Sequence, residues 1–183
     1  AGGQVSLNGV ALTNPSGTIS ITGGNTGLGA PGVLIHPGSS IAGSLVSITG
    51  TSSTQEGVRI VGTAPSVANI SGGTVSIQGS SQSGVDAVYL SNATVAASNS
   101  LTIGALGAQR VNLDANVSVS NTGAGDLLLR GDRLEIAATA TVNSGSGART
   151  VIKPTTSARS IGLGGSDDAG KLHVSNDELQ RIT

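Results

Sequence analysis

The chain has 183 residues and contains no cysteine, methionine, phenylalanine or tryptophan, and only one tyrosine. A thick core of large side chains is therefore excluded. Glycine contributes 29 residues, yet the many β-branched residues argue against disorder. Whatever folds here must bury small Val, Ile, Leu and Ala side chains in a thin, regular stack. The absence of cysteine is compatible with a secreted bacterial protein.

Charge and long apolar runs are also scarce. Nine Lys and Arg residues face ten Asp and Glu residues, for a net charge of -1, and no basic cluster exceeds two neighbours. Nucleic acid is therefore not expected as a partner. No stretch reaches the roughly 18 apolar residues that a membrane helix requires, and the N-terminus lacks a basic-then-apolar signal segment. If the protein is exported, we expect this chain to be a mature form or a piece of something longer.

Apolar residues recur in three separate tracks, whose steps all fall between 23 and 30 residues. The first track comprises Ile21, Ile48, Ile77, Ile103, Leu129 and Ile152. The second comprises Leu7, Ile35, Ile60, Leu90, Leu113, Ile136 and Leu163. The third comprises Leu12, Ile41, Val67, Val95, Val119 and Val142. Three tracks that keep one period and one cyclic order indicate a structural repeat.

Each track residue sits in a short segment that alternates apolar and small polar residues, which is the period of a half-buried strand. Gly, Asn, Ser and Pro clusters separate these segments and supply turns. We therefore predict an all-β, right-handed parallel β-helix over residues 1–174, with three strands per coil. Roughly six coils spaced by about 4.8 Å give a rod near 30 Å long. A β-sandwich is the alternative fold, but it predicts no three-track register.

Two glycine-rich stretches invite a functional interpretation. "GLGAPG", residues 27–32, matches the dinucleotide fingerprint but leads into the strand-like "VLI" instead of a helix, so we interpret it as a turn. Asp167 and Asp168 in "GGSDDAG" suggest paired carboxylates or calcium ligands. The loop lacks the repeated spacing of solenoid calcium sites, and no other coil offers an acid at an equivalent turn. We predict a solvated turn.

Few other residues could form a catalytic, metal-binding or glycan-binding site. His36 and His173, the only histidines, lie 137 residues apart, so a shared metal site is not expected. Tyr89 alone is weak support for a glycan site, which normally stacks several aromatic rings. Nothing resembles a nucleophile with its base. We therefore predict no catalytic residue, no metal ligand and no cofactor, and we predict that the chain is not an enzyme.

Hydroxyl and amide side chains suggest two further possibilities. Rows of hydroxyl side chains on a flat solenoid face can bind ice. The residues beside the first track form such a row, but it breaks after three coils. Its members are Thr18, Leu45 and Thr74 with Ser20, Ser47 and Ser76. Three glycosylation sequons begin at Asn69, Asn92 and Asn116. So many Asn, Ser and Thr residues make chance sequons expected, so glycosylation stays a hypothesis.

The last residues, 175–183, carry a helical signal. Ser175 followed by Glu178 forms a capping box, and Leu179 and Ile182 then fall on one side of a short helix. Such a turn could lie over the rod or cover its last coil, where open strand edges invite stacking. If the parent chain continues, we expect another strand to follow.

The segment "RTVIKPTTSARSIGLGGSDDAGKLHVSNDELQRI", residues 149–182, resembles a segment of filamentous-haemagglutinin-type exoproteins. These adhesins of Gram-negative bacteria leave the cell through a partner outer-membrane barrel in two-partner secretion. The resemblance implies a β-helical shaft at the cell surface or in the medium, without a cofactor. The N-terminal secretion domain of that family is not evident here, so we expect a fragment from the middle of a longer chain.

These features together predict a non-catalytic shaft of a secreted bacterial adhesin, a monomeric rod whose loops contact a receptor or glycan on a host or neighbouring cell. An enzyme alternative, a β-helix polysaccharide lyase or hydrolase, needs several carboxylates and basic groups on one face. Only 10% of the residues are charged, and they are spread along the sequence. A glycan-binding or ice-binding solenoid is the other alternative.

Overall fold

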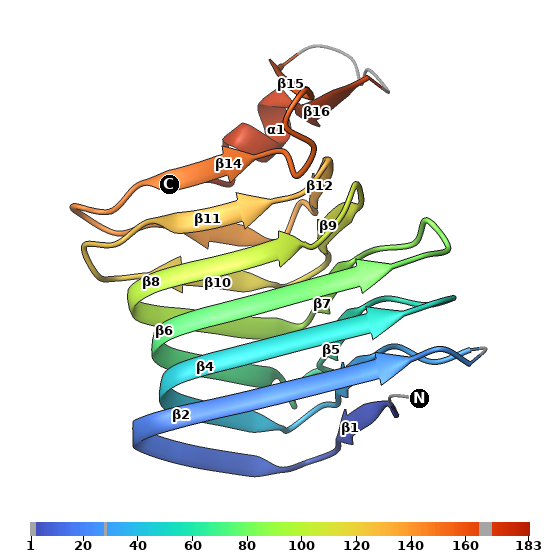
Figure 1. The fold of residues 1–183 in the computed structure, drawn as a ribbon. Helices are drawn as coiled ribbons and strands as arrows, with labels where there is room; N and C mark the ends of the chain where they lie inside the picture. The colour runs from blue at the N-terminus through green and yellow to red at the C-terminus, as the bar shows by residue number, and fades with distance from the viewer. Residues whose placement is uncertain (1–2, 28, 165–169) are drawn as a thin grey trace.

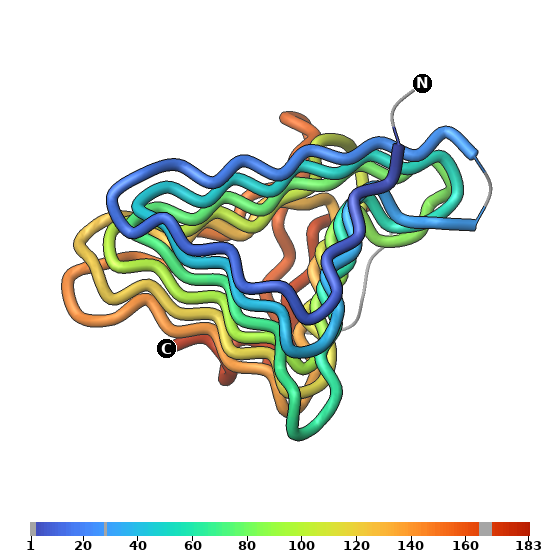
Figure 2. Tube along the Cα trace, turned by 90° about the horizontal axis from the view of Figure 1, so that it is seen from below, coloured from blue at the N-terminus to red at the C-terminus, as the bar shows by residue number. Residues whose placement is uncertain are grey.

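The structure, a computed structural model, describes residues 3–27, 29–164 and 170–183. It confirms the parallel β-solenoid, whose strands stack coil on coil (Figure 1). Figure 2 views the molecule from its N-terminal end, and the chain there runs clockwise as it moves away, so the coil is right-handed.

One side of the solenoid is a six-stranded parallel sheet. In spatial order its strands are β1 (Val5–Leu7), β3 (Val33–Ile35), β5 (Val58–Val61), β7 (Val88–Ser91), β9 (Arg110–Leu113) and β12 (Arg133–Ile136). These strands carry the second track, and each track residue from Leu7 to Ile136 pairs with the next. The inward-facing residues of β3, β5 and β7 are fully buried, as the two-residue period predicts.

The other two faces form one eight-stranded sheet. Its members are β2 (Ala11–Asn25), β4 (Ser40–Ser52), β6 (Ala68–Ser81), β8 (Ala93–Ala105), β10 (Ser118–Asn121), β11 (Leu127–Arg130), β13 (Thr141–Asn143) and β14 (Thr150–Lys153). In the first four of these, one long strand carries both the third and the first track. Register shifts between Asn14 and Thr18, and between Gly72 and Thr74, mark the boundary between the two faces. After β8 the chain divides this long strand into two short ones.

The first track is confirmed at every step, because Ile21, Ile48, Ile77, Ile103, Leu129 and Ile152 pair consecutively. The third track is wrong at one position. Ile41 pairs with Ile70, and Ile70 with Val95, whereas Val67 is 37% exposed. Residues 62–67 form a turn that places Val67 outside the strand, so Ile70 is buried in its place.

The last predicted member of the second track is also wrong. Leu163 lies in β15 (Ser160–Leu163), where it is 67% exposed, and pairs with Val174 of β16 (Lys171–Val174) in a separate two-stranded sheet. It is β16 that lies against β12, with Leu172 and Val174 buried. Leu172 and Val174 of β16 therefore cover β12 in place of Leu163.

The final helix is short and caps the stack. In α1 (Asn176–Leu179), Ser175 and Glu178 form the predicted capping box. The Glu178 carboxylate also accepts a 3.0 Å hydrogen bond from the backbone N–H of Ile136. Ile182 then bridges to Val142 in parallel, and together with Leu179 it packs against the core. Residues 175–183 therefore pack against the last coil.

A candidate binding face at one corner of the solenoid

The six-stranded sheet presents a polar row to solvent. Residues that precede each second-track position pair in register across four coils, and they are Arg59, Tyr89, Asn112 and Glu135. Their neighbours along each strand are buried, so alternation turns these side chains away from the core. Arg59, Tyr89 and Glu135 reach solvent, whereas Asn112 is buried and donates a hydrogen bond to Asp86. Several charges that look scattered in the sequence therefore lie next to one another on this sheet.

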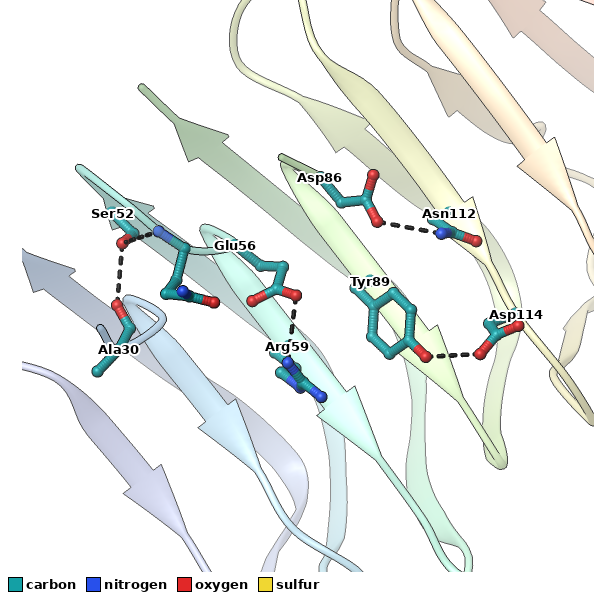
Figure 3. Close-up of polar contacts among 9 residues, drawn as sticks. Ala30, Ser52, Glu56, Arg59, Asp86, Tyr89, Asn112 and Asp114 are labelled. Carbon is teal, nitrogen blue, oxygen red and sulfur yellow. Dashed lines mark hydrogen bonds and ion pairs between the residues drawn. The ribbon is translucent and has the colours of Figure 1, made fainter. Parts of the chain in front are cut away.

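Tyr89 is held on both sides within this row. Its hydroxyl donates a 2.5 Å hydrogen bond to Asp114, and the guanidinium of Arg59 lies 5.3 Å from its ring centroid (Figure 3). Burial, followed by the hydrogen bond to Asp114, raises the pKa of Tyr89. The same hydrogen bond lowers the pKa of Asp114. Arg59 on the preceding coil covers one face of the ring, and Asp114 on the following coil accepts the hydroxyl hydrogen bond. Tyr89 therefore links three coils.

A second row lies at the corner where the chain enters the six-stranded sheet. Counting back two residues from the paired valines Val58 and Val88 places Glu56 level with Asp86. The pairing of β7 with β9 and of β9 with β12 then places Gln109 and Asp132 on the same line. We call this set, Glu56, Asp86, Gln109 and Asp132, the corner row. Asp86 and Asp132 are both buried.

Each carboxylate of the corner row has a basic or amide partner. Glu56 pairs with Arg59 at 3.3 Å, and Asp86 accepts a 3.0 Å hydrogen bond from Asn112 (Figure 3). Asp86 also pairs with Arg110, whose second nitrogen lies 2.6 Å from a carboxylate oxygen of Glu135.

Arg110 therefore links its own coil to the coils on either side of it. Its hydrogen bond to Asp86 raises its pKa. Charges at this corner tie the coils together, because each ionic partner lies on a neighbouring coil or in the same turn.

Asp132 organises the turn that follows β14. Its carboxylate accepts 2.8 Å hydrogen bonds from the backbone N–H groups of Thr155 and Thr156 and a 2.5 Å bond from the Thr156 hydroxyl. Arg159 lies 3.8 Å away. Burial raises the pKa of Asp132, but these hydrogen bonds and the charge of Arg159 outweigh it and bring the pKa below its usual range. Asp132 is thus held as a carboxylate.

A cleft of about 350 Å³ opens beside the corner row. Its charged walls come from three consecutive coils and comprise Arg110, Arg133 and Arg159 with Asp132, while Gln109 adds an amide. Arginine forks bind planar anions, so the chemical bias of this cleft is toward an anionic group.

Neither of the two histidines singled out in the sequence lines this cleft. Asp167 and Asp168 lie outside the described residues. His36 accepts or donates a 3.1 Å hydrogen bond with Ser6, and His173 does so at 3.0 Å with the carbonyl of Gly164. The two histidines occupy different ends of the coil stack. Within the described residues, no group of three His, Cys, Asp or Glu side chains is placed to hold a metal ion.

The other predicted motifs fall in structural positions. Residues 29–32 of the glycine-rich stretch lead directly into β3 without forming a helix, as the sequence indicates. The serine row of Ser20, Ser47 and Ser76 continues to Thr102, one coil further than predicted, and Leu128 follows. No helix in the described part of the chain is long and apolar enough to cross a membrane.

The three sequon asparagines lie in two kinds of position, one in a strand and two in turns. Asn69 is exposed on β6. Asn92 and Asn116 adopt left-handed backbone conformations with φ of 46° and 56°. The Asn116 amide donates a 3.0 Å hydrogen bond to the side-chain oxygen of Asn92. Two of the three asparagines therefore have a structural role in a turn, and glycosylation stays a prediction.

Sequence reasoning missed the corner row, although the signal was present. Each member lies four residues before a second-track position, ahead of Ile60, Leu90, Leu113 and Ile136. Glu56, Asp86 and Asp132 show that acids recur at one place in the repeat. The prediction for the turn of Asp167 and Asp168 stays a prediction, because these two residues lie outside the described part of the chain.

Comparison with known proteins identifies no family for this chain. No family model, curated protein or solved structure matches the chain. What is established is a right-handed parallel β-solenoid that carries a charged corner and an arginine-lined cleft.

Proposed function

We propose that this chain is part of the shaft of a secreted or surface-displayed bacterial adhesin of the filamentous-haemagglutinin type. The observation that supports the proposal is the unbroken register of the first track from Ile21 to Ile152. Every coil hydrogen-bonds to its neighbours along whole strands, so bending the rod costs many backbone bonds at once. A stiff rod of this kind sets a fixed distance between its two ends.

In this proposal the rod is monomeric and non-catalytic, and its turns meet a receptor or glycan on a host or neighbouring cell. An outer-membrane transporter of a Gram-negative bacterium passes the parent protein to the cell surface. The variable parts lie at the corners, such as residues 26–32 and 82–87, while the strands between them keep one register. Length variation at the corners leaves the core unchanged, so surface contacts can diversify.

The location of the protein tests this proposal. An antibody raised against the purified chain is applied to intact and to permeabilised cells of the source bacterium, with a cytoplasmic protein as the control. We expect label on intact cells that disappears after external protease treatment. Label confined to permeabilised cells would overturn the surface assignment.

The corner row supports a second candidate, a β-helix polysaccharide lyase or hydrolase. Buried carboxylates of Asp86 and Asp132 lie on the same corner as Arg110 and Arg133, a combination that polyanion-cleaving β-helices use. Against it, both carboxylates are engaged by several donors. Incubation with polygalacturonate, alginate and neutral glucans, followed by chromatography of the products, decides between the two. Shortened chains that form with wild type and not with Arg133→Gln would establish the enzyme.

A further inference from the structure

The C-terminal segment occupies the place that a further coil would take. The buried side chains of Leu172 and Val174 in β16 cover β12. Ile182 pairs in parallel with Val142, where the next residue of the third track would lie. We call residues 171–183 the end cap. The end cap leaves one face of the last coil open, because β14 pairs only with β11 in the described part of the chain.

The end cap bonds to backbone groups at the edge of the last coil. The N–H of Val142 donates to the carbonyl of Arg181 at 2.9 Å, and its carbonyl accepts from the N–H of Thr183 at 2.8 Å. The N–H of Ile136 donates to the carboxylate of Glu178 at 3.0 Å, and its carbonyl accepts from the guanidinium of Arg181. These are the donors and acceptors that a following parallel strand would use, so the end cap takes the place of that strand.

The opposite end of the solenoid has an open edge. The two large sheets end at β1 and β2, whose outer sides pair with no strand of residues 3–27, 29–164 and 170–183. The N–H of Val5 and the carbonyl of Leu7 bond to the second coil, so the backbone groups of Ser6 between them point away from the stack. The first charged residue of the chain is Glu56. The first coil therefore lacks the charges that commonly protect an edge strand from pairing.

The two ends match each other in spacing and in chain direction. Each end presents one residue of each track, and the two sets are Leu7, Leu12 and Ile21 in the first coil and Ile136, Val142 and Ile152 in the last. Successive members lie 5 and 9 residues apart in the first set, and 6 and 10 residues apart in the second. All strands of these sheets run parallel, so the first coil of a second copy continues the stack without a change of direction.

We propose that the end cap is an autoinhibitory contact that covers a self-assembly surface. When the end cap leaves the last coil, that edge pairs with β1 and β2 of a second copy, and the tracks of the two copies form one core. Such a head-to-tail contact does not close on itself, so released copies join into longer rods. With the end cap in place the chain stays monomeric. The inference goes beyond the proposed shaft, because it concerns how one rod joins another.

Light scattering after size-exclusion chromatography of the full chain tests the inference. Glu178→Ala with Ile182→Gly loosens the end cap, because it removes the capping box and the apolar contact with the core. We expect this variant to reach an average mass about twofold or more above the monomer, rising with concentration. The matched control, Asp177→Ala with Gln180→Gly, changes two exposed residues of the same segment and should stay monomeric, as should wild type.

A third variant tests which edge receives the released coil. Ser6→Pro removes an N–H of the open edge, and proline is tolerated in edge strands. Added to the loosened variant, it should restore the monomer. Electron microscopy of the loosened variant should show rods that lengthen without becoming thicker.

Thermal unfolding followed by circular dichroism verifies that each variant folds, and Ile182→Gly alone replaces the double variant if that one does not. A folded, loosened variant that stays monomeric would overturn the proposal, and so would assembly of wild type or of the control. Assembly that persists with Ser6→Pro, or rods that associate side by side, would show a different contact and would also overturn it. None of these outcomes depends on where the protein is located, so the proposed shaft and the proposed end cap fail separately.

Discussion

The hydroxyl of Tyr89 donates a 2.5 Å hydrogen bond to the carboxylate of Asp114, which directly follows β9, the next strand of the six-stranded sheet. Burial, and after it this contact, raises the pKa of Tyr89, and the contact lowers the pKa of Asp114. Tyr89 is the only aromatic residue of the chain, so its ultraviolet absorbance reports on this one contact.

We predict that the Tyr89 phenol ionises above the ordinary tyrosine value of about 10. Asp114→Asn should lower the midpoint, because the negative charge that opposes phenolate formation is gone while the side chain keeps its size. The measurement is an absorbance titration of both proteins, with Asp126→Asn as a control remote from the tyrosine. Identical midpoints in wild type and Asp114→Asn would show that Asp114 does not act on Tyr89.

Gly50 sits where the long strand β4 meets the chain entering β5. A Cβ atom at this position would lie 1.9 Å from the carbonyl oxygen of Gly57, and the paired residues Gly23 and Gly79 show the same close approach. We predict that Gly50→Ala destabilises the fold by about 3 kcal/mol or more, since backbone must move. Gly3→Ala, with nothing within 4 Å of the added Cβ, is the matched control. Equal denaturant midpoints for the two variants would contradict the account.

Asn116 occupies a left-handed turn with φ of 56°. Asparagine and glycine tolerate this conformation, whereas alanine loses about 1–2 kcal/mol there. We therefore expect Asn116→Gly to be more stable than Asn116→Ala by about 1 kcal/mol, although both lose the hydrogen bond to Asn92. Chemical unfolding of the pair provides the measurement. Equal stabilities would mean that the turn conformation carries no cost.

Acid should destabilise the solenoid through two hydrogen-bonded carboxylates, the half-buried Asp114 and the buried Asp132. The pKa values of Asp114 and Asp132 lie below that of an unfolded aspartate, about 3.9. Both groups therefore stabilise the fold at neutral pH, and this contribution is lost as the pH falls from about 4 through the folded-state values. Unfolding free energies measured between pH 7 and pH 2.5 should decline in wild type and decline less steeply in Asp132→Asn. Parallel curves for the two proteins would contradict this role.

Much of the core was predictable because a two-residue period repeated at one coil length determines which side chains face inward. Ile48, Ile77 and Ile103 follow from the sequence alone, since each occupies the same place in its coil. The choice between Val67 and Ile70 was not predictable in the same way. Both are β-branched and they lie three residues apart, so only the turn at residues 62–67 decides which is buried.

The charged corner was predictable only in principle. Its members lie at a fixed distance before the second track, but Arg110 and Asp86 meet through side-chain reach across coils, which no spacing specifies. The exposure of Leu163 depends on the extra strand β16, which takes the place beside β12. Where two segments could occupy the same place, as β15 and β16 could beside β12, the sequence pattern does not decide between them.

The central claim is that the coils form one stiff rod in continuous register. Thr22 and Lys153, both exposed, lie at the two ends of a row of five consecutive pairings through Thr49, Gln78, Gly104 and Arg130. At about 4.8 Å per coil these positions are about 24 Å apart. Because the chain has no cysteine, Thr22→Cys with Lys153→Cys allows two spin labels to be placed without further changes. Pulsed electron paramagnetic resonance should give one narrow distance distribution near this value, whereas a broad or bimodal distribution would contradict the rigid shaft.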